Sequence, residues 1–97
     1  MSDPVTVVAI VGGTPGTAPG IEAAIRACVA PTRAEAGCLS YEAKRDPETP
    51  GRYVFVESWE TPAALDAHMQ TPHLKALGAA LQALGASLQV IKLQPLD

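Results

Sequence analysis

The sequence predicts an α+β domain whose antiparallel sheet carries its helices on one face. Strand-like segments and helical apolar stripes follow one another in the order β-α-β-β-α-β. The two middle strands are joined by a short turn-forming run, which is typical of antiparallel neighbours. The chain has 97 residues, enough for one core and too few for two. Residues 1–97 are therefore expected to form a single domain with the split arrangement of a ferredoxin-like fold.

The first strand is expected at residues 5–11, a run of β-branched residues that ends at Gly12 and Gly13. Both of its alternating faces are apolar, which predicts burial on two sides. Residues 12–20 are expected to form a flexible loop. Its glycine spacing matches no phosphate-binding or dinucleotide-binding motif.

A helix is expected to begin near Pro19, because proline suits the first helical position. Pro31 is expected to limit its length. The helix has one apolar stripe with helical spacing, formed by Ile21, Ala24, Ile25, Cys28 and Val29.

A hairpin follows, with strands at residues 38–45 and 52–60 around a turn at residues 46–51. Its second strand is expected to be covered on both sides. Because the turn does not determine the register, it stays open whether Tyr41 and Glu57 share a face. One face of the second strand carries Tyr53, Phe55, Glu57 and Trp59, and the other carries Val54, Val56 and Ser58.

Two Thr-Pro pairs predict two further helices, because threonine is a good N-cap and proline a good first residue. Thr61-Pro62 opens a short helix to about residue 70, and Thr71-Pro72 opens a second that stops at Gly85. Residues 88–93 form the last expected strand.

This arrangement has a consequence for assembly. Helices on one face leave the second apolar face of two strands uncovered, and soluble monomers rarely expose large apolar patches. A homodimer in which two sheets pack together is therefore expected.

The charge pattern excludes several partners. Ten acidic and seven basic residues give a net charge of −3 without a basic block, so no nucleic acid and no membrane surface is expected as a partner. Residues 1–4 lack the basic flank of a signal peptide, which predicts a cytoplasmic protein. Cys28 and Cys38 are too few for a disulfide framework or a zinc site and are expected to be reduced and buried.

His68 is the leading candidate for chemistry. It follows Leu65 by three residues and Ala64 by four, so it shares their inward helical face. An imidazole there suits a general base or a hydrogen-bond donor to a substrate oxygen. The alternative is a core histidine that is satisfied by a backbone carbonyl.

His73 and Glu57 are the other ionisable candidates. His68 and His73 lack the i, i+4 spacing of helical metal ligands, and no cysteine or carboxylate cluster completes a set, so no metal is expected. His73 lies at a helix start, where it can help to cap free amides. Glu57, between aromatic neighbours, must pair with an arginine or lysine or stay protonated with a raised pKa.

Trp59 and Tyr41 suit an aromatic wall for a planar ligand, or ordinary core filling. The sequence has no nucleophile elbow, no Ser-His-Asp pattern and no nucleotide fingerprint, so no cofactor is expected.

Four segments together resemble the antibiotic biosynthesis monooxygenase family, especially its small quinol-monooxygenase-like bacterial members. They are residues 35–41 (EAGCLSY), 55–59 (FVESW), 64–68 (ALDAH) and 71–73 (TPH). The resemblance implies a dimeric α/β barrel and a cofactor-free oxidation of a small quinol or polycyclic phenol with dioxygen. It also implies that His68 is the base or oxyanion partner.

The same resemblance implies that Glu57 orients the substrate and that Trp59, Tyr41 and His73 help to bind it. Haem-degrading relatives carry a histidine where this chain has Gly78 and an asparagine on the first strand, which this strand lacks. Two alternatives stay open. One is an isomerase of a small phosphorylated signal-breakdown product, disfavoured by the missing basic cluster, and the other is a non-catalytic dimer that binds an aromatic ligand.

Overall fold

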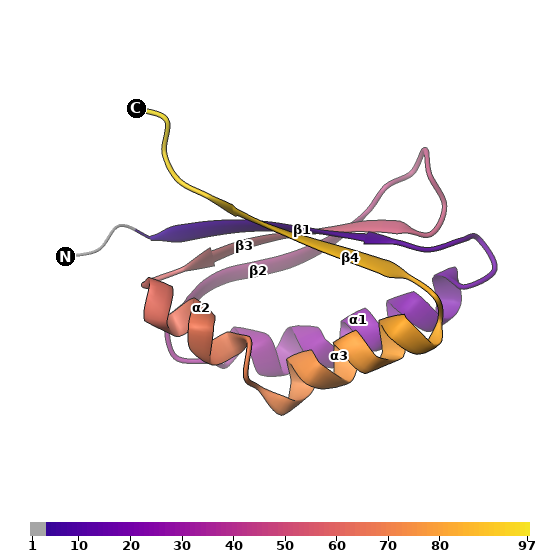
Figure 1. Cartoon of the computed structure of the whole chain (residues 1–97), viewed down its shortest axis with the longest axis horizontal. Coiled ribbons are helices and arrows are strands. Elements are labelled where there is room, and N and C mark those ends of the chain that lie inside the picture. The colour runs from indigo at the N-terminus through magenta and orange to yellow at the C-terminus, as the bar shows by residue number, and fades with distance from the viewer. Residues whose placement is uncertain (1–3) are drawn as a thin grey trace.

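A computed structural model describes residues 4–97 as a four-stranded antiparallel sheet with its helices on one face (Figure 1). The predicted α+β, ferredoxin-like fold is confirmed. Residues 1–3, on which part of the signal-peptide argument depends, lie outside the described range. The elements are β1 (Val5–Gly12), α1 (Ala18–Arg33), β2 (Cys38–Arg45), β3 (Arg52–Trp59), α2 (Pro62–His68), α3 (Pro72–Ala83) and β4 (Ser87–Leu93).

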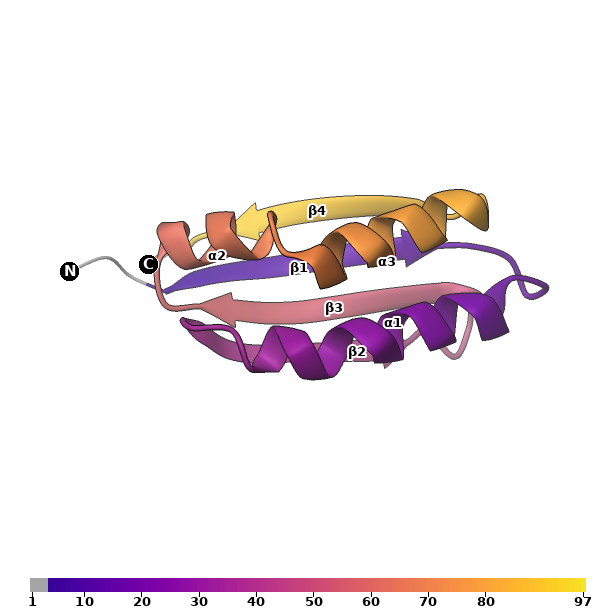
Figure 2. The ribbon, with the colours of Figure 1, turned by 90° about the horizontal axis from the view of Figure 1, so that it is seen from below.

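The strand order in the sheet is β2-β3-β1-β4, so the first strand of the chain lies inside the sheet and the hairpin strand β2 at its edge. α1 runs below β2 and β3, while α2 and α3 run below β1 and β4 (Figure 2). The core lies between these layers, and its largest fully buried side chains include Trp59, Phe55, Ile21 and Leu81.

α1 differs from its expected bounds. It begins at Ala18 and continues to Arg33 with Pro31 inside it, so the expectation that Pro31 limits the helix is wrong, and so is that of a loop reaching residue 20. Proline removes one helical hydrogen bond. Packing holds the last turn nonetheless, because Thr32 is fully buried and the Nε of Arg33 donates to the Tyr41 carbonyl at 2.9 Å.

The two Thr-Pro pairs act as expected. The Thr61 and Thr71 hydroxyls accept hydrogen bonds from the Ala64 and Leu74 amides, at 3.1 and 3.3 Å. α2 ends at His68, two residues earlier than expected, because Thr71 turns back to the His68 carbonyl with both its amide and its hydroxyl. These two caps set the angle between the short helices and so the position of the His68 ring.

The face of the sheet opposite the helices, which we call the outer face, is covered by no described element (Figure 1). Burial on both sides is therefore wrong for the single chain, since Val8, Ile10 and Val54 are only partly buried and Val56 is 38% exposed. Strand pairing places Val8 between Val56 and Ile91, so the apolar side chains form a continuous stripe. No helix among residues 4–97 is long and apolar enough to cross a membrane.

Candidate active site

A cavity of about 240 Å³ lies between the inner face of the sheet and the helices α2 and α3. Its walls are almost entirely apolar, which is the usual character of a small-molecule site. Four polar side chains interrupt them: Tyr41 from β2, Glu57 from β3, His68 from α2 and Lys75 from α3. The exposed side chains of Met69, Leu88 and Val90 also line it and form its open side.

The His68 ring lies in this wall with 2% of its surface exposed. Its Nδ1 is 2.8 Å from Oε2 of Glu35, and since a carboxylate only accepts hydrogen bonds, Nδ1–H is the donor. Nε2 has no partner among the described side chains, yet no buried side-chain nitrogen or oxygen of residues 4–97 lacks one. Nε2 therefore keeps access to the cavity, with a free lone pair in this tautomer.

Two aromatic rings hold the imidazole in place. The Trp59 ring lies 4.5 Å from it between centroids, tilted by 31°, and the Tyr41 ring meets it edge-on at 5.7 Å. Such contacts restrict the ring to one orientation. His68 is thus bound on one edge by Glu35, packed on its faces, and open at the edge that faces the cavity.

Glu35 was missed as a functional candidate by the sequence analysis. It lies in the turn between α1 and β2, where Gly37 adopts a φ of +83° and its carbonyl accepts from the Glu60 amide at 2.8 Å. This turn directs the Glu35 side chain towards the end of α2. The only sequence signal was its place at the start of the segment 35–41 that carries the family resemblance.

His73 also contacts Glu35. Its Nε2 is 2.7 Å from the same Oε2 that His68 contacts. The expectation that no carboxylate completes a set with the two histidines is therefore wrong, because the missing carboxylate comes from a distant turn. His73 does not line the cavity, so its expected substrate contact is not seen.

Glu57 and Tyr41 are direct cross-strand partners, which resolves the open question of register: they share the inner face. No arginine or lysine among residues 4–97 pairs with Glu57. Its Oε1 accepts instead from the Trp59 indole at 2.9 Å. Burial is the largest influence and raises the pKa of the Glu57 carboxyl, while the indole hydrogen bond lowers it.

Trp59 is fully buried behind Glu57 and does not line the cavity, which corrects its expected role as a wall. Tyr41 does line it with its ring. The Tyr41 hydroxyl points towards Cys28, 3.9 Å away in α1, and burial raises its pKa far above the usual range. Tyr41 is therefore a neutral, apolar wall. Cys28 and Cys38 are both free thiols, and Cys28 is buried, whereas Cys38 is only partly buried, against expectation.

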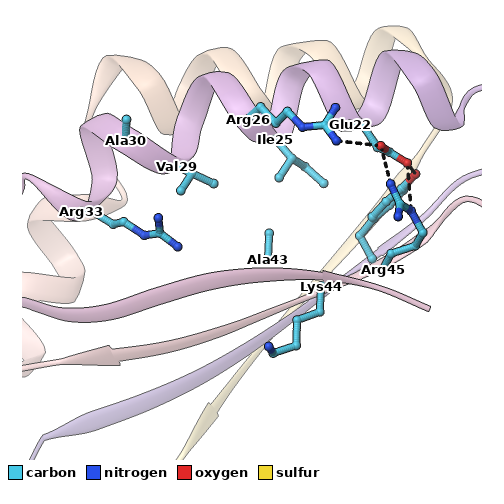
Figure 3. Close-up of a pocket in the computed structure, with 10 residues that line it drawn as sticks. Glu22, Ile25, Arg26, Val29, Ala30, Arg33, Ala43, Lys44 and Arg45 are labelled. Atoms are coloured by element: carbon cyan, nitrogen blue, oxygen red, sulfur yellow. Dashed lines mark hydrogen bonds and ion pairs between the residues drawn. The ribbon is translucent and has the colours of Figure 1, made fainter. Parts of the chain in front are cut away.

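A second, larger groove of about 470 Å³ runs between α1 and β2 (Figure 3). Its charged groups satisfy one another: Glu22 binds Arg26, Arg45 and the Tyr53 hydroxyl. Hydrogen bonds from Arg45 and then Tyr53 lower the pKa of Glu22 to about 2. Lys44 points to the other side of the sheet (Figure 3). This groove is an ion-pair network between α1 and the hairpin, with no group left over for chemistry.

The model of the antibiotic biosynthesis monooxygenase family matches residues 4–80. A Mycobacterium tuberculosis relative, named "Putative monooxygenase Rv0793", is 34% identical over 98 residues, which is 100% of this chain and 96% of that protein. "Probable quinol monooxygenase YgiN" of Escherichia coli is 41% identical over 46 residues, 47% of this chain. That match spans 44% of YgiN, and another spans 31% of the uncharacterized protein sll1783 of Synechocystis.

Solved structures match over the whole fold. The crystal structure of PA3566 from Pseudomonas aeruginosa superposes with a TM-score of 0.90 at 36% identity, covering 100% of this chain and 98% of the other. The structure of Rv0793 superposes with a TM-score of 0.87, covering 98% and 97%.

Proposed function

Because the chain belongs to the antibiotic biosynthesis monooxygenase family, we propose that it is a cofactor-independent monooxygenase that oxidises a small quinol or phenol with dioxygen. The observation that carries this proposal is the state of His68. Glu35 holds Nδ1–H, and the unprotonated Nε2 faces an apolar cavity. A base beside an aromatic-lined cavity is what the first step of such a reaction needs.

The chemistry follows from the substrate. Removal of a phenolic proton by Nε2 of His68 gives an electron-rich anion, which passes an electron to dioxygen directly. The apolar walls strengthen the attraction between this anion and the imidazolium, because the local dielectric is low. Glu35 stabilises the imidazolium from its other edge and is a positioning residue, since it does not touch the substrate.

Glu57 and Lys75 supply the remaining polar contacts. Glu57 is held by the Trp59 indole and presents its second oxygen towards the cavity. A carboxyl with a raised pKa donates a hydrogen bond to a substrate oxygen when protonated. Lys75 is the only cation among the lining residues, which disfavours a phosphorylated substrate. At about 240 Å³ the cavity is smaller than a typical drug-sized site, so substrates of one or two rings fit the single chain best.

The test measures oxygen uptake with a series of quinols of one to three rings. His68→Ala should lower kcat by about 10²-fold, the usual effect of removing a general base. Glu35→Gln should lower kcat with little change in KM, because Glu35 acts through His68. Asp66→Ala, an exposed acidic residue on the same helix, is the matched control and should keep full activity. Turnover should persist in a chelator.

Two results would contradict this proposal. A folded His68→Ala variant with full activity removes His68 from the mechanism. Saturable quinol binding without oxygen uptake, for every quinol in the series, identifies a binding protein instead of an enzyme.

A further inference from the structure

Three side chains from three separate segments meet beside His68: Glu35 from the turn after α1, His68 from the end of α2 and His73 from the start of α3. Their potential ligand atoms all lie within 4.8 Å of one another. We propose that they form a site for a divalent transition-metal ion of the zinc type, and that occupancy of this site inhibits the enzyme. The metal site does not depend on the proposed function, whereas its inhibitory effect does.

The donor set is suited to such an ion. Two imidazole nitrogens and one carboxylate oxygen are the ligands of many three-coordinate protein sites, which complete their shell with water. The present distances of 2.7 and 2.8 Å are those of hydrogen bonds. Bonds of about 2.0–2.1 Å to a tetrahedral ion separate neighbouring ligands by about 3.3 Å. The three groups therefore need to move apart by only about half an ångström.

Burial and access also favour an ion. His68 is nearly closed to solvent, with 3% of its side chain exposed, and Glu35 follows with 13%. His73 is 21% exposed and gives the ion a path from the surface. A carboxylate held between two imidazoles in this partly dry setting attracts a cation, and metal binding replaces the two protons that now join the three groups.

The site lies on the edge of His68 that points away from the cavity. A metal ion on Nδ1 excludes the Nδ1–H tautomer, so the neutral ring must carry its proton on Nε2. Nε2 then donates a hydrogen bond and no longer accepts a proton from the substrate. The ion thus switches His68 from a base to a donor without entering the substrate cavity.

Binding is measured by titrating the chelator-treated protein with ZnCl₂ by calorimetry and with CoCl₂ by visible absorption. We expect saturation at one ion per chain, intense tetrahedral cobalt bands and a higher Tm with zinc, because an ion that binds only the folded state stabilises it. Glu35→Gln and His73→Ala should each weaken binding by about 100-fold or more, since loss of a direct ligand exceeds the usual effect of an outer-shell change.

Two matched controls separate this site from its surroundings. Cys38→Ser removes the partly buried thiol near Glu35, and Glu60→Gln removes an exposed carboxylate nearby; both should leave the affinity unchanged. All variants are first checked for folding by circular dichroism. Absence of stoichiometric binding in the wild type, or binding that survives Glu35→Gln and His73→Ala, overturns the proposed site.

The activity arm keeps the two proposals apart. Zinc should abolish oxygen uptake and a chelator should restore it. If zinc binds with one ion per chain while turnover is unchanged, the metal site stands and the inhibition is wrong. If no quinol is oxidised under any condition, the proposed function fails, and the binding measurements still decide the metal site.

Discussion

Glu57 places a carboxyl group in an almost wholly apolar wall, and its only side-chain hydrogen bond comes from the Trp59 indole. Burial raises its pKa above the ordinary value of 4.5. In the unfolded chain the carboxyl ionises first as the pH rises, while the folded protein holds its proton longer. The free energy of unfolding therefore falls as the pH rises through the raised pKa, and below the ordinary pKa this penalty is absent.

A glutamine keeps the shape and the hydrogen-bond acceptor without the charge. We expect Glu57→Gln to have a higher Tm than the wild type at pH 8 and an unchanged Tm near pH 4. Thermal unfolding across this range measures the difference. Glu60→Gln, an exposed neighbour on the chain, is the control and should show no such trend. A lower Tm for Glu57→Gln at pH 8 would mean that the buried ion stabilises the fold.

At the scale of elements, the turn between α1 and β2 determines where Glu35 lies. Gly37 has a φ of +83°, a conformation that other residues rarely adopt. A Cβ there would meet the Ala64 Cβ of α2 at 2.5 Å. The close approach of this turn to α2 is therefore what brings the carboxylate of Glu35 to the imidazole of His68.

Gly37→Ala should lower the free energy of unfolding by about 2 kcal/mol or more, from left-handed strain and the contact with α2. It should also lower turnover more than it raises KM, because Glu35 is displaced. Urea unfolding and oxygen uptake measure the two effects. Gly78→Ala is the contrasting variant, since no atom lies within 4 Å of its added Cβ in α3; it should raise stability by up to about 1 kcal/mol. Equal stability of the two variants would contradict this account.

At the scale of the molecule, the outer face of the sheet carries a stripe of apolar side chains that no described element covers. The sheet is only half enclosed by its helices, as Figure 1 shows. The expected homodimer, with two such faces packed together, would remove this surface from water. Assembly remains a prediction for this chain.

Light scattering at micromolar concentration should give twice the chain mass of 10.0 kDa, with an interface of more than about 1,200 Å². Val56→Asp, a charge in the middle of the outer face, should dissociate the dimer or prevent folding. Ala76→Asp, on the exposed side of α3, should leave the mass unchanged. A wild-type mass of 10.0 kDa would contradict the prediction, whatever the variants do.

The sequence by itself determined the elements and their order, because these depend on local signals. Period-two alternation marked the strands, the Thr-Pro pairs marked the starts of α2 and α3, and Gly85 marked the end of α3. The same local spacing placed His68 on an inward helical face, where the structure has it. Local rules failed at Pro31, since the packing of Thr32 and Arg33 against the rest of the fold outweighs the helix-breaking effect.

Only the tertiary structure decided which side chains meet. Glu35 lies 33 residues before His68 and 38 before His73, so no sequence period connects them. Their contact depends on the angle of two short helices and on one left-handed turn. The hairpin register likewise came from packing, and it placed Glu57 beside Tyr41. Burial also separated Tyr41, which lines the cavity, from Trp59, which lies behind it, because the space between layers depends on every side chain that fills them.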